Sequence, residues 1–357
     1  MTERDMQTET RTGRPTIFDV AERAGVSKSL VSVVLRGKSG VSDAKRAAVL
    51  RAADQLGYRP NAAARSLAEQ RTHTVGAVLS DLRNPWFIDL LASVRAELSA
   101  RGLNLFLSED YQLETDASVL DAFVDARVDG LLCLGTLPPT AQLLATARSL
   151  PTVVASGREP DLACVDVVTG DDRAGASRAV EHLVELGHTR IAHLAGTGRA
   201  AELRTDGYRE QMRRHGLDAQ IRVEVSDRSE AGDLAAATAL LAAANRPTAI
   251  LANNDYAAVI TMSHAQSLGL SIPGDLSVVG YDNSYLARTG YIGLTSIDNS
   301  YTEMGRLAVQ RLVERIAEPQ APRTVTLLDP TLRVRKTSAA PRHRRTEKSG
   351  ASVPDGA

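Results

Sequence analysis

The chain has 357 residues, a length that predicts two or three domains rather than one. Hydrophobic residues make up 43 % of it and charged residues 24 %, a balance that favours folded, soluble domains over a disordered chain. The amino-terminal end has no apolar signal segment, and no apolar run approaches the roughly 18 residues of a membrane helix, so we expect a cytoplasmic protein.

Charge is distributed unevenly along the chain. The net charge is −2 for residues 1–10, +7 for residues 11–71, −11 for residues 72–332 and +5 for residues 333–357. A basic segment attached to an acidic body predicts a polyanionic partner, such as nucleic acid, for the first part alone.

The first predicted domain, residues 15–60, has three short helical segments and no strand pattern. It follows a polar arm at residues 1–14, which we expect to be disordered. A residue that can cap a helix precedes each segment: Thr16 before 17–24, Ser27 before 28–35 and Ser42 before 43–56.

The first two segments are arranged as a helix-turn-helix, which places its second helix in the major groove of DNA. Lys28, Ser29 and Ser32 stand on the outer face of that second helix. An alternative is a structural three-helix cap on the rest of the protein, but such a cap would not require a net charge of +7. The expected core consists of Val20, Ala21, Ala24, Val26, Val31 and Val34.

The linker at residues 61–73 predicts a conditional helix. Pro60 ends the preceding helix, and Asn61 is a good N-cap for a new one. The segment allows at most about two turns, and a helix so short is marginal alone in water. We therefore expect it to fold only when DNA and a second copy of the chain pack on it.

Residues 74–334 alternate short apolar runs with helical runs, the pattern of doubly wound parallel sheets. The stretch is too long for one sheet, so we expect an α/β body of two lobes with a ligand between them, beyond the carboxyl ends of the strands. Residues 335–357, rich in Arg, Ser and Pro, predict a disordered tail. The expected strands are 75–80, 103–107, 130–134, 153–155, 190–195, 249–252 and 276–280, and the expected helices include 86–101, 171–186, 202–215, 231–244 and 256–268.

A dense and ordered set of motifs runs through the chain. It begins with DVAERAGVS, VSVVL, VSDAKR and LGYRPNAAARSL between residues 19 and 67, and it continues with NPWF, LGHTRIA and VVGYD up to residue 282. In these motifs, and to about residue 333, the sequence resembles the LacI/GalR (lactose-repressor) family. The resemblance implies a transcriptional repressor with a periplasmic-binding-protein-like sensor, which binds a palindromic double-stranded DNA operator as a homodimer or higher oligomer.

The resemblance assigns DNA-binding roles. Lys28 and Ser29 match base-reading positions, and Leu67 matches the leucine that wedges into the minor groove. Val33 departs from the family, which usually has an arginine there, so the operator sequence cannot be carried over. Arg36 stands where Asn is common. Thr16, Ser27, Ser32, Ser42 and Asn61 match positions that contact phosphates or orient the helices, and Tyr58 and Ala64 complete the candidate DNA-binding set.

Polar and aromatic residues near the ends of several expected strands are candidates for binding a small-molecule effector, which we expect to be a carbohydrate. By resemblance Arg204, Asn254 and Asp282 match effector-contacting positions, and such groups suit the adjacent hydroxyls of a sugar. Structural alternatives remain open: Asp282 as a turn cap, Asn254 as a helix N-cap and Trp86 as first-turn core. The full candidate set is Asp81, Trp86, Phe87, Arg204, Asn254 and Asp282.

Two other functions fit parts of the sequence. Gly196 to Ala201 form a G-x-G-x-x-A pattern typical of dinucleotide-binding oxidoreductases, with Glu224 placed to reach a ribose. We expect a loop beside the cleft instead, because the strand lies deep in the chain and the predicted helix begins late. A transport solute-binding protein shares the two-lobed fold, but it needs a signal peptide and no basic domain. No other catalytic motif or metal-ligand spacing of Cys133 and Cys164 is present, so we expect no enzyme, cofactor or metal.

Overall fold

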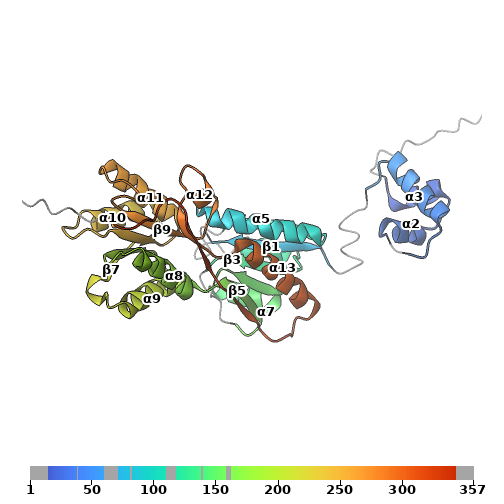
Figure 1. Cartoon of the computed structure of the whole chain (residues 1–357). Coiled ribbons are helices and arrows are strands. Elements are labelled where there is room, and N and C mark those ends of the chain that lie inside the picture. Colours follow the sequence, from blue (N-terminus) through green and yellow to red (C-terminus); the bar gives the residue numbers. More distant parts are fainter. Residues whose placement is uncertain are drawn as a thin grey trace, which may run out of the picture. The chain divides into compact units, whose positions relative to one another are not determined.

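The computed structural model describes residues 15–37, 39–59, 71–80, 83–109, 118–137, 140–157 and 162–342. They form two compact units that divide between Thr72 and His73, and Figure 1 labels many of their helices and strands. None of the described helices is long and apolar enough to cross a membrane.

The amino-terminal unit contains α1 (Ile17–Ala24), α2 (Lys28–Leu35) and α3 (Asp43–Gln55). Thr16 and Asp19 form a reciprocal capping box, and Ser27 Oγ accepts a hydrogen bond from the Leu30 N–H at 3.2 Å. Ser42 occupies the N-cap position of α3, but its side chain makes no capping hydrogen bond. The expected side-chain cap at Ser42 is therefore wrong.

The core of this unit is aliphatic and small. Four of its six expected residues are buried, whereas Ala24 and Val26 are only partly buried beside them. The third helix supplies the other wall of the core with Val49, Ala52 and Ala53. Packing of α3 across the first two helices therefore holds α2 in place, with its outer face left for a partner.

The first lobe of the larger unit is a parallel sheet in the order β11-β5-β4-β3-β1-β2. One face packs against α5 (Pro85–Ala100) and α13 (Tyr301–Ala317), and the other against α6 (Ser118–Asp125) and α7 (Ala141–Ser149). Its strands are β1 (Thr74–Leu79), β2 (Asn104–Glu109), β3 (Gly130–Leu134), β4 (Thr152–Ala155), β5 (Val165–Gly170) and β11 (Val325–Leu328).

The second lobe is a sheet in the order β12-β10-β9-β8-β6-β7, parallel except for the β10–β12 pair. Figure 1 shows α10 (Glu230–Leu241) and α11 (Asp255–Ser267) on one face and α8 (Asp172–Glu185) and α9 (Arg199–Arg214) on the other. Its strands are β6 (Ile191–Ala195), β7 (Arg222–Val225), β8 (Ala249–Ala252), β9 (Ser277–Tyr281), β10 (Thr295–Asp298) and β12 (Thr331–Arg333), and α12 (Tyr285–Arg288) follows β9.

The chain crosses between the lobes after β5, after β10 and between β11 and β12. These crossings bring α13, which follows the second lobe in sequence, onto the first sheet. Asp166 inside β5 and Arg315 of α13 form a buried pair, with two nitrogen–oxygen distances of 2.6 and 2.9 Å. Because Asp166 interrupts the apolar pattern that is typical of a buried strand, β5 is absent from the strands predicted from the sequence.

Residues 335–342 pack on the second lobe, so the expected tail at 335–357 is wrong for this part. Thr337 is buried, its hydroxyl donates to the Val278 carbonyl at 2.6 Å, and its own carbonyl accepts from the Val278 N–H at 2.8 Å. The polar composition suggested disorder, but these backbone hydrogen bonds to β9 fix the segment. Residues 343–357 lie outside the described part, as does the arm at 1–14.

Candidate functional site

The outer face of α2 presents the expected base-reading side chains. Lys28 and Ser29 are exposed, and the Lys28 ammonium lies 4.7 Å from the centre of the exposed Phe18 ring. Arg36 folds back on its own helix, where it donates to the Ser32 carbonyl at 3.2 Å and to the Ser32 hydroxyl at 2.5 Å. Two candidate contact residues are therefore hydrogen-bonded to each other, while Lys28 and Ser29 are accessible.

The remaining candidate DNA-binding residues differ in exposure. Thr16, Ser27 and Ser42 are exposed at helix N-termini, Val33 is partly buried, and Tyr58 packs against the core of the small unit. Asn61, Ala64 and Leu67, and with them the expected hinge helix, lie outside the described residues, as does Asp81 of the effector set.

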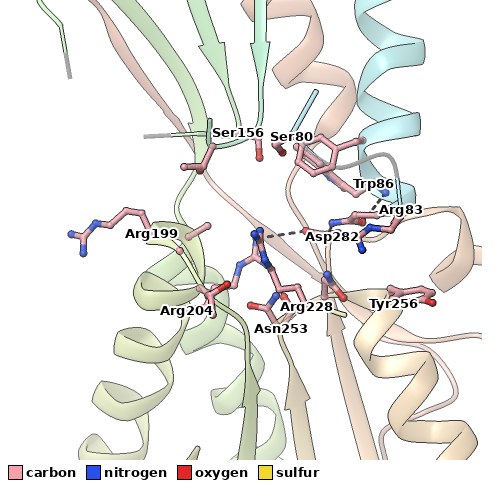
Figure 2. Close-up of a pocket in the computed structure, with 18 of the residues that line it drawn as sticks. Ser80, Arg83, Trp86, Ser156, Arg199, Arg204, Arg228, Asn253, Tyr256 and Asp282 are labelled. Atoms are coloured by element: carbon pink, nitrogen blue, oxygen red, sulfur yellow. Dashed lines mark hydrogen bonds and ion pairs between the residues drawn. The ribbon is translucent and has the colours of Figure 1, made fainter. Parts of the chain in front are cut away.

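A pocket of about 380 Å³ lies between the lobes, at the carboxyl ends of strands from both sheets. Figure 2 shows Ser80 and Ser156 on the side of the first sheet and Arg204 and Asn253 on the side of the second. Five of the six candidate effector residues line this pocket, namely Trp86, Phe87, Arg204, Asn254 and Asp282.

Arg204 is the buried cation at the base of the pocket. It donates to Asp172 at 2.9 Å and to the Asn253 carbonyl at 2.5 Å, lies 3.6 Å from Asp282, and stacks over the Tyr281 ring at 3.7 Å. Burial alone would lower the pKa of Arg204, but the two carboxylates outweigh it and raise that pKa. The guanidinium is thus charged and held in one orientation.

Two neighbouring carboxyls are buried beside it. Burial raises the pKa of Asp282 to about 6, against the opposing effect of Arg204, and raises the pKa of Asp255 to about 7 with Asp282 as an added cause. Asp255 accepts hydrogen bonds from the Ser284 N–H, the Ser284 hydroxyl and the Ser296 hydroxyl at 2.6 to 2.8 Å. The side chain of Asp282 contacts Asn84 of the first lobe at 3.3 Å, so this acid joins the two lobes.

The structure supports the structural alternatives for two of the three candidates, both of which also line the pocket. Asn254 caps α11 by accepting from the Ala257 N–H at 2.8 Å. Trp86 is 2 % exposed and belongs to the core of the first lobe, with Phe87 packed on it edge to face at 5.2 Å. Asp282 has a left-handed backbone, with φ of 103°, at the turn after β9. Asn254 and Trp86 therefore have structural roles besides lining the pocket. The described contacts of the Asp282 side chain are instead with Asn84, Asn299 and Arg204.

The prediction for the glycine-containing turn at 196–198 differs from the structure. The helix α9 begins at Arg199, directly after the turn, and β6-α9-β7 is a parallel βαβ unit that opens the second sheet. The late start of the helix is therefore wrong as a reason to set the dinucleotide-binding pattern aside, and β6 begins a βαβ unit although it lies deep in the chain. Glu224 lies within β7 beside Arg222.

Several lining residues did not emerge from the sequence, among them Asn253, Arg228 and Ser156. Each follows the carboxyl end of a strand, which is the signal that could have identified it. Arg228 follows β7, and Asp172 of the Arg204 cluster follows β5; neither strand was predicted.

Comparison with known proteins agrees with both units. Residues 16–61 match the family of bacterial regulatory proteins, lacI family, and residues 180–338 match the periplasmic binding protein-like domain. The ribose operon repressor of Escherichia coli (strain K12) is 34 % identical over 324 residues, which cover 89 % of this chain and 98 % of that protein.

Two solved structures match this chain over the length of both units. A lac repressor dimer bound to operator and an anti-inducer is 28 % identical with a TM-score of 0.80, covering 92 % of this chain and all of that one. A complex of the transcriptional regulator CelR with cellobiose is 30 % identical with a TM-score of 0.67, covering 91 % of this chain and all of that one.

A helix-turn-helix unit joined to a two-lobed sensor defines a class of ligand-responsive DNA-binding regulators. The chain belongs to the LacI family of bacterial regulatory proteins, and it is a DNA-binding transcriptional regulator with the role of a repressor.

Proposed function

We propose that this repressor binds a palindromic operator as a homodimer and that a carbohydrate effector in the interlobe pocket controls its affinity for DNA. The observation that carries the effector proposal is the buried, fixed Arg204–Asp282 pair in a pocket that also contains Asn254 and Phe87. Preoriented donors and acceptors beside an aromatic wall suit the alternating polar and apolar faces of a sugar.

On DNA, we assign base contacts to Lys28, Ser29 and Val33, and phosphate or positioning contacts to Thr16, Ser27, Ser32, Arg36, Ser42 and Tyr58. Asn61, Ala64 and Leu67 are assigned to the connector on the same basis of resemblance. Arg36 must exchange its bonds to Ser32 for a phosphate or base, which the exposed position of its guanidinium allows.

Control by the effector requires that ligand binding in the pocket change how the two lobes close on each other. Contacts across the lobes support such a device: Asp89 of α5 pairs with Arg288 of α12 at 2.9 Å, and Asn84 contacts Asp282. The proposed role is binding rather than catalysis, in the cytoplasm where the operator is found.

Selection from a randomised duplex library with the full chain tests the operator proposal. We expect an enriched palindrome whose binding weakens steeply with salt and whose complex contains two chains. Enrichment of no sequence at low ionic strength would contradict it. For the effector, a sugar that raises the melting temperature should also change operator affinity.

A further inference from the structure

We infer that the effector is a phosphorylated sugar, with its phosphate at the turn between β6 and α9 and with Arg228 as the phosphate's cation. This inference rests on the proposed function, because it names the chemical class of the ligand in the same pocket.

The pocket lining is rich in arginine. Its described lining contains four arginines (Arg83, Arg199, Arg204 and Arg228) and two carboxylates, Glu230 and Asp282. Residues 72–332 as a whole carry a net charge of −11. Asp172 and Glu202, just outside this lining, pair with Arg204 and Arg199, so the attraction for an anionic ligand depends on which arginine has no acidic partner.

The arginines differ in availability. Arg204 is held between two carboxylates, and Arg199 pairs with Glu202 at 3.0 Å and points away from the centre of the pocket in Figure 2. Arg228 forms no ion pair with any residue that the structure describes, and it is exposed at the pocket wall. Arg83 of the first lobe acts on Asp227, whose pKa it helps to lower, and on Tyr256. Arg228 is therefore the arginine that we assign to a ligand.

The turn supplies hydrogen-bond donors. Gly198, with φ of +91°, leads into the 16-residue α9 with no side-chain cap. The N–H groups of Arg199, Ala200 and Ala201 find no acceptor among the described residues. By contrast, Asn84, Ser229 and Asn254 cap the other three helices, α5, α10 and α11, whose first turns line the pocket. Uncapped N–H groups at the start of a long helix bind phosphate oxygens well.

An independent observation points to a ligand at the same turn. Asn253 is 7 % exposed, lines the pocket, and has a buried side-chain oxygen without a hydrogen-bond partner among the described residues. A Cβ at position 196 would lie 2.6 Å from its amide nitrogen, so Gly196 lets this amide pack directly on the turn. A buried polar group without a partner is costly, and a ligand hydroxyl here would satisfy it.

The opposite wall distinguishes a sugar phosphate from inorganic phosphate. Ser80, Thr136 and Ser156 present hydroxyls from the first lobe, and Phe87 presents an aromatic face. These groups suit a polyhydroxylated ring, so the two lobes would hold the two halves of one ligand.

Calorimetric titration of the full chain with matched pairs tests the inference. The pairs are ribose with ribose 5-phosphate and glucose with glucose 6-phosphate, and glucuronate and inorganic phosphate are added as other anions. We expect the phosphorylated member of at least one pair to bind about tenfold more tightly than its neutral partner. The inference is overturned if no phosphorylated sugar binds more tightly than its partner, or if glucuronate or phosphate binds best.

Two arginine variants locate the anion. Arg228→Gln should weaken phosphosugar binding about tenfold and leave neutral-sugar binding unchanged. The control Arg213→Gln, at an exposed arginine of α9 outside the pocket lining, should change either by less than about twofold. Equal effects of the two variants would overturn the role of Arg228, with urea denaturation as the check on folding. Operator binding, measured on the same preparations without sugar, tests the proposed function separately, because losing the phosphate preference leaves DNA binding intact.

Discussion

The amino-terminal unit and the interlobe pocket both depend on arginine and lysine, but they hold these cations in opposite settings. Lys28 and Arg36 are exposed on a small unit whose core is aliphatic, and Arg36 bonds to the hydroxyl and the carbonyl of Ser32. Arg204 is buried between two carboxylates and an aromatic ring. Exposed cationic side chains can change conformation to contact a polyanion at little cost in free energy. A buried cation is held in one orientation, so it binds only ligands whose shape matches that orientation.

The largest effect should come from breaking the buried cluster. Arg204→Met leaves Asp172 and Asp282 buried without their cation, so we expect the free energy of unfolding of the larger unit to fall by about 3–5 kcal/mol in urea denaturation. Arg199→Met, at an exposed pair, should change it by less than about 0.5 kcal/mol. Similar losses for both variants would mean that the cluster is not desolvated.

The acid pair should make stability depend on pH in a definite direction. Because burial raises the pKa of Asp255 to about 7, the folded protein binds a proton that the unfolded chain releases near pH 4. Stability contributed by this group is therefore full below about pH 4 and decreases as pH rises to about 7.

His193, whose pKa burial lowers to about 4, changes stability with pH in the opposite direction. Since both the native chain and Asp255→Asn contain His193, the difference between their stabilities isolates the contribution of Asp255. The Ser296 hydroxyl can turn to accept from the new amide. We expect the variant to gain stability relative to the native chain between pH 5 and pH 8, by an amount on the order of 3 kcal/mol. A constant difference across that range would contradict the assignment.

On the DNA side, Lys28→Ala should weaken binding to the selected operator by about 1–3 kcal/mol. Fluorescence anisotropy with the operator and with a scrambled duplex separates base reading from phosphate attraction. The scrambled duplex should lose much less affinity, and equal losses on both would assign Lys28 to phosphate.

The smallest effect is expected at the contact between the lobes. Asp89→Asn removes a pair with Arg288 that is partly exposed, so stability should fall by only about 0.5–1 kcal/mol. The same variant can be titrated with an effector. If its affinity for the effector changes while its affinity for the operator does not, this pair acts on lobe closure.

The sequence alone determined the helix-turn-helix, the alternating β and α segments and five residues of the pocket wall. Local signals suffice for most of these features: capping residues, apolar periodicity, and polar residues directly after strands such as the one ending at Ala252. Arg204, which lies within α9, was identified through the family resemblance. They act within a few residues and are therefore visible in a linear chain.

Only the tertiary structure decided which of these signals come together. Because the chain crosses between the lobes, Arg315 reaches Asp166, which lies 149 positions earlier, and neutralises it. This pairing allows β5 to be a buried strand although it contains an acid. Residues 335–342 are ordered for the same reason, since their hydrogen bonds reach back to Ser277 and Val278. The burial and charge environment of Arg204, Asp282 and Asn253 likewise arise from segments distant in sequence, because desolvation depends on what surrounds a group in space.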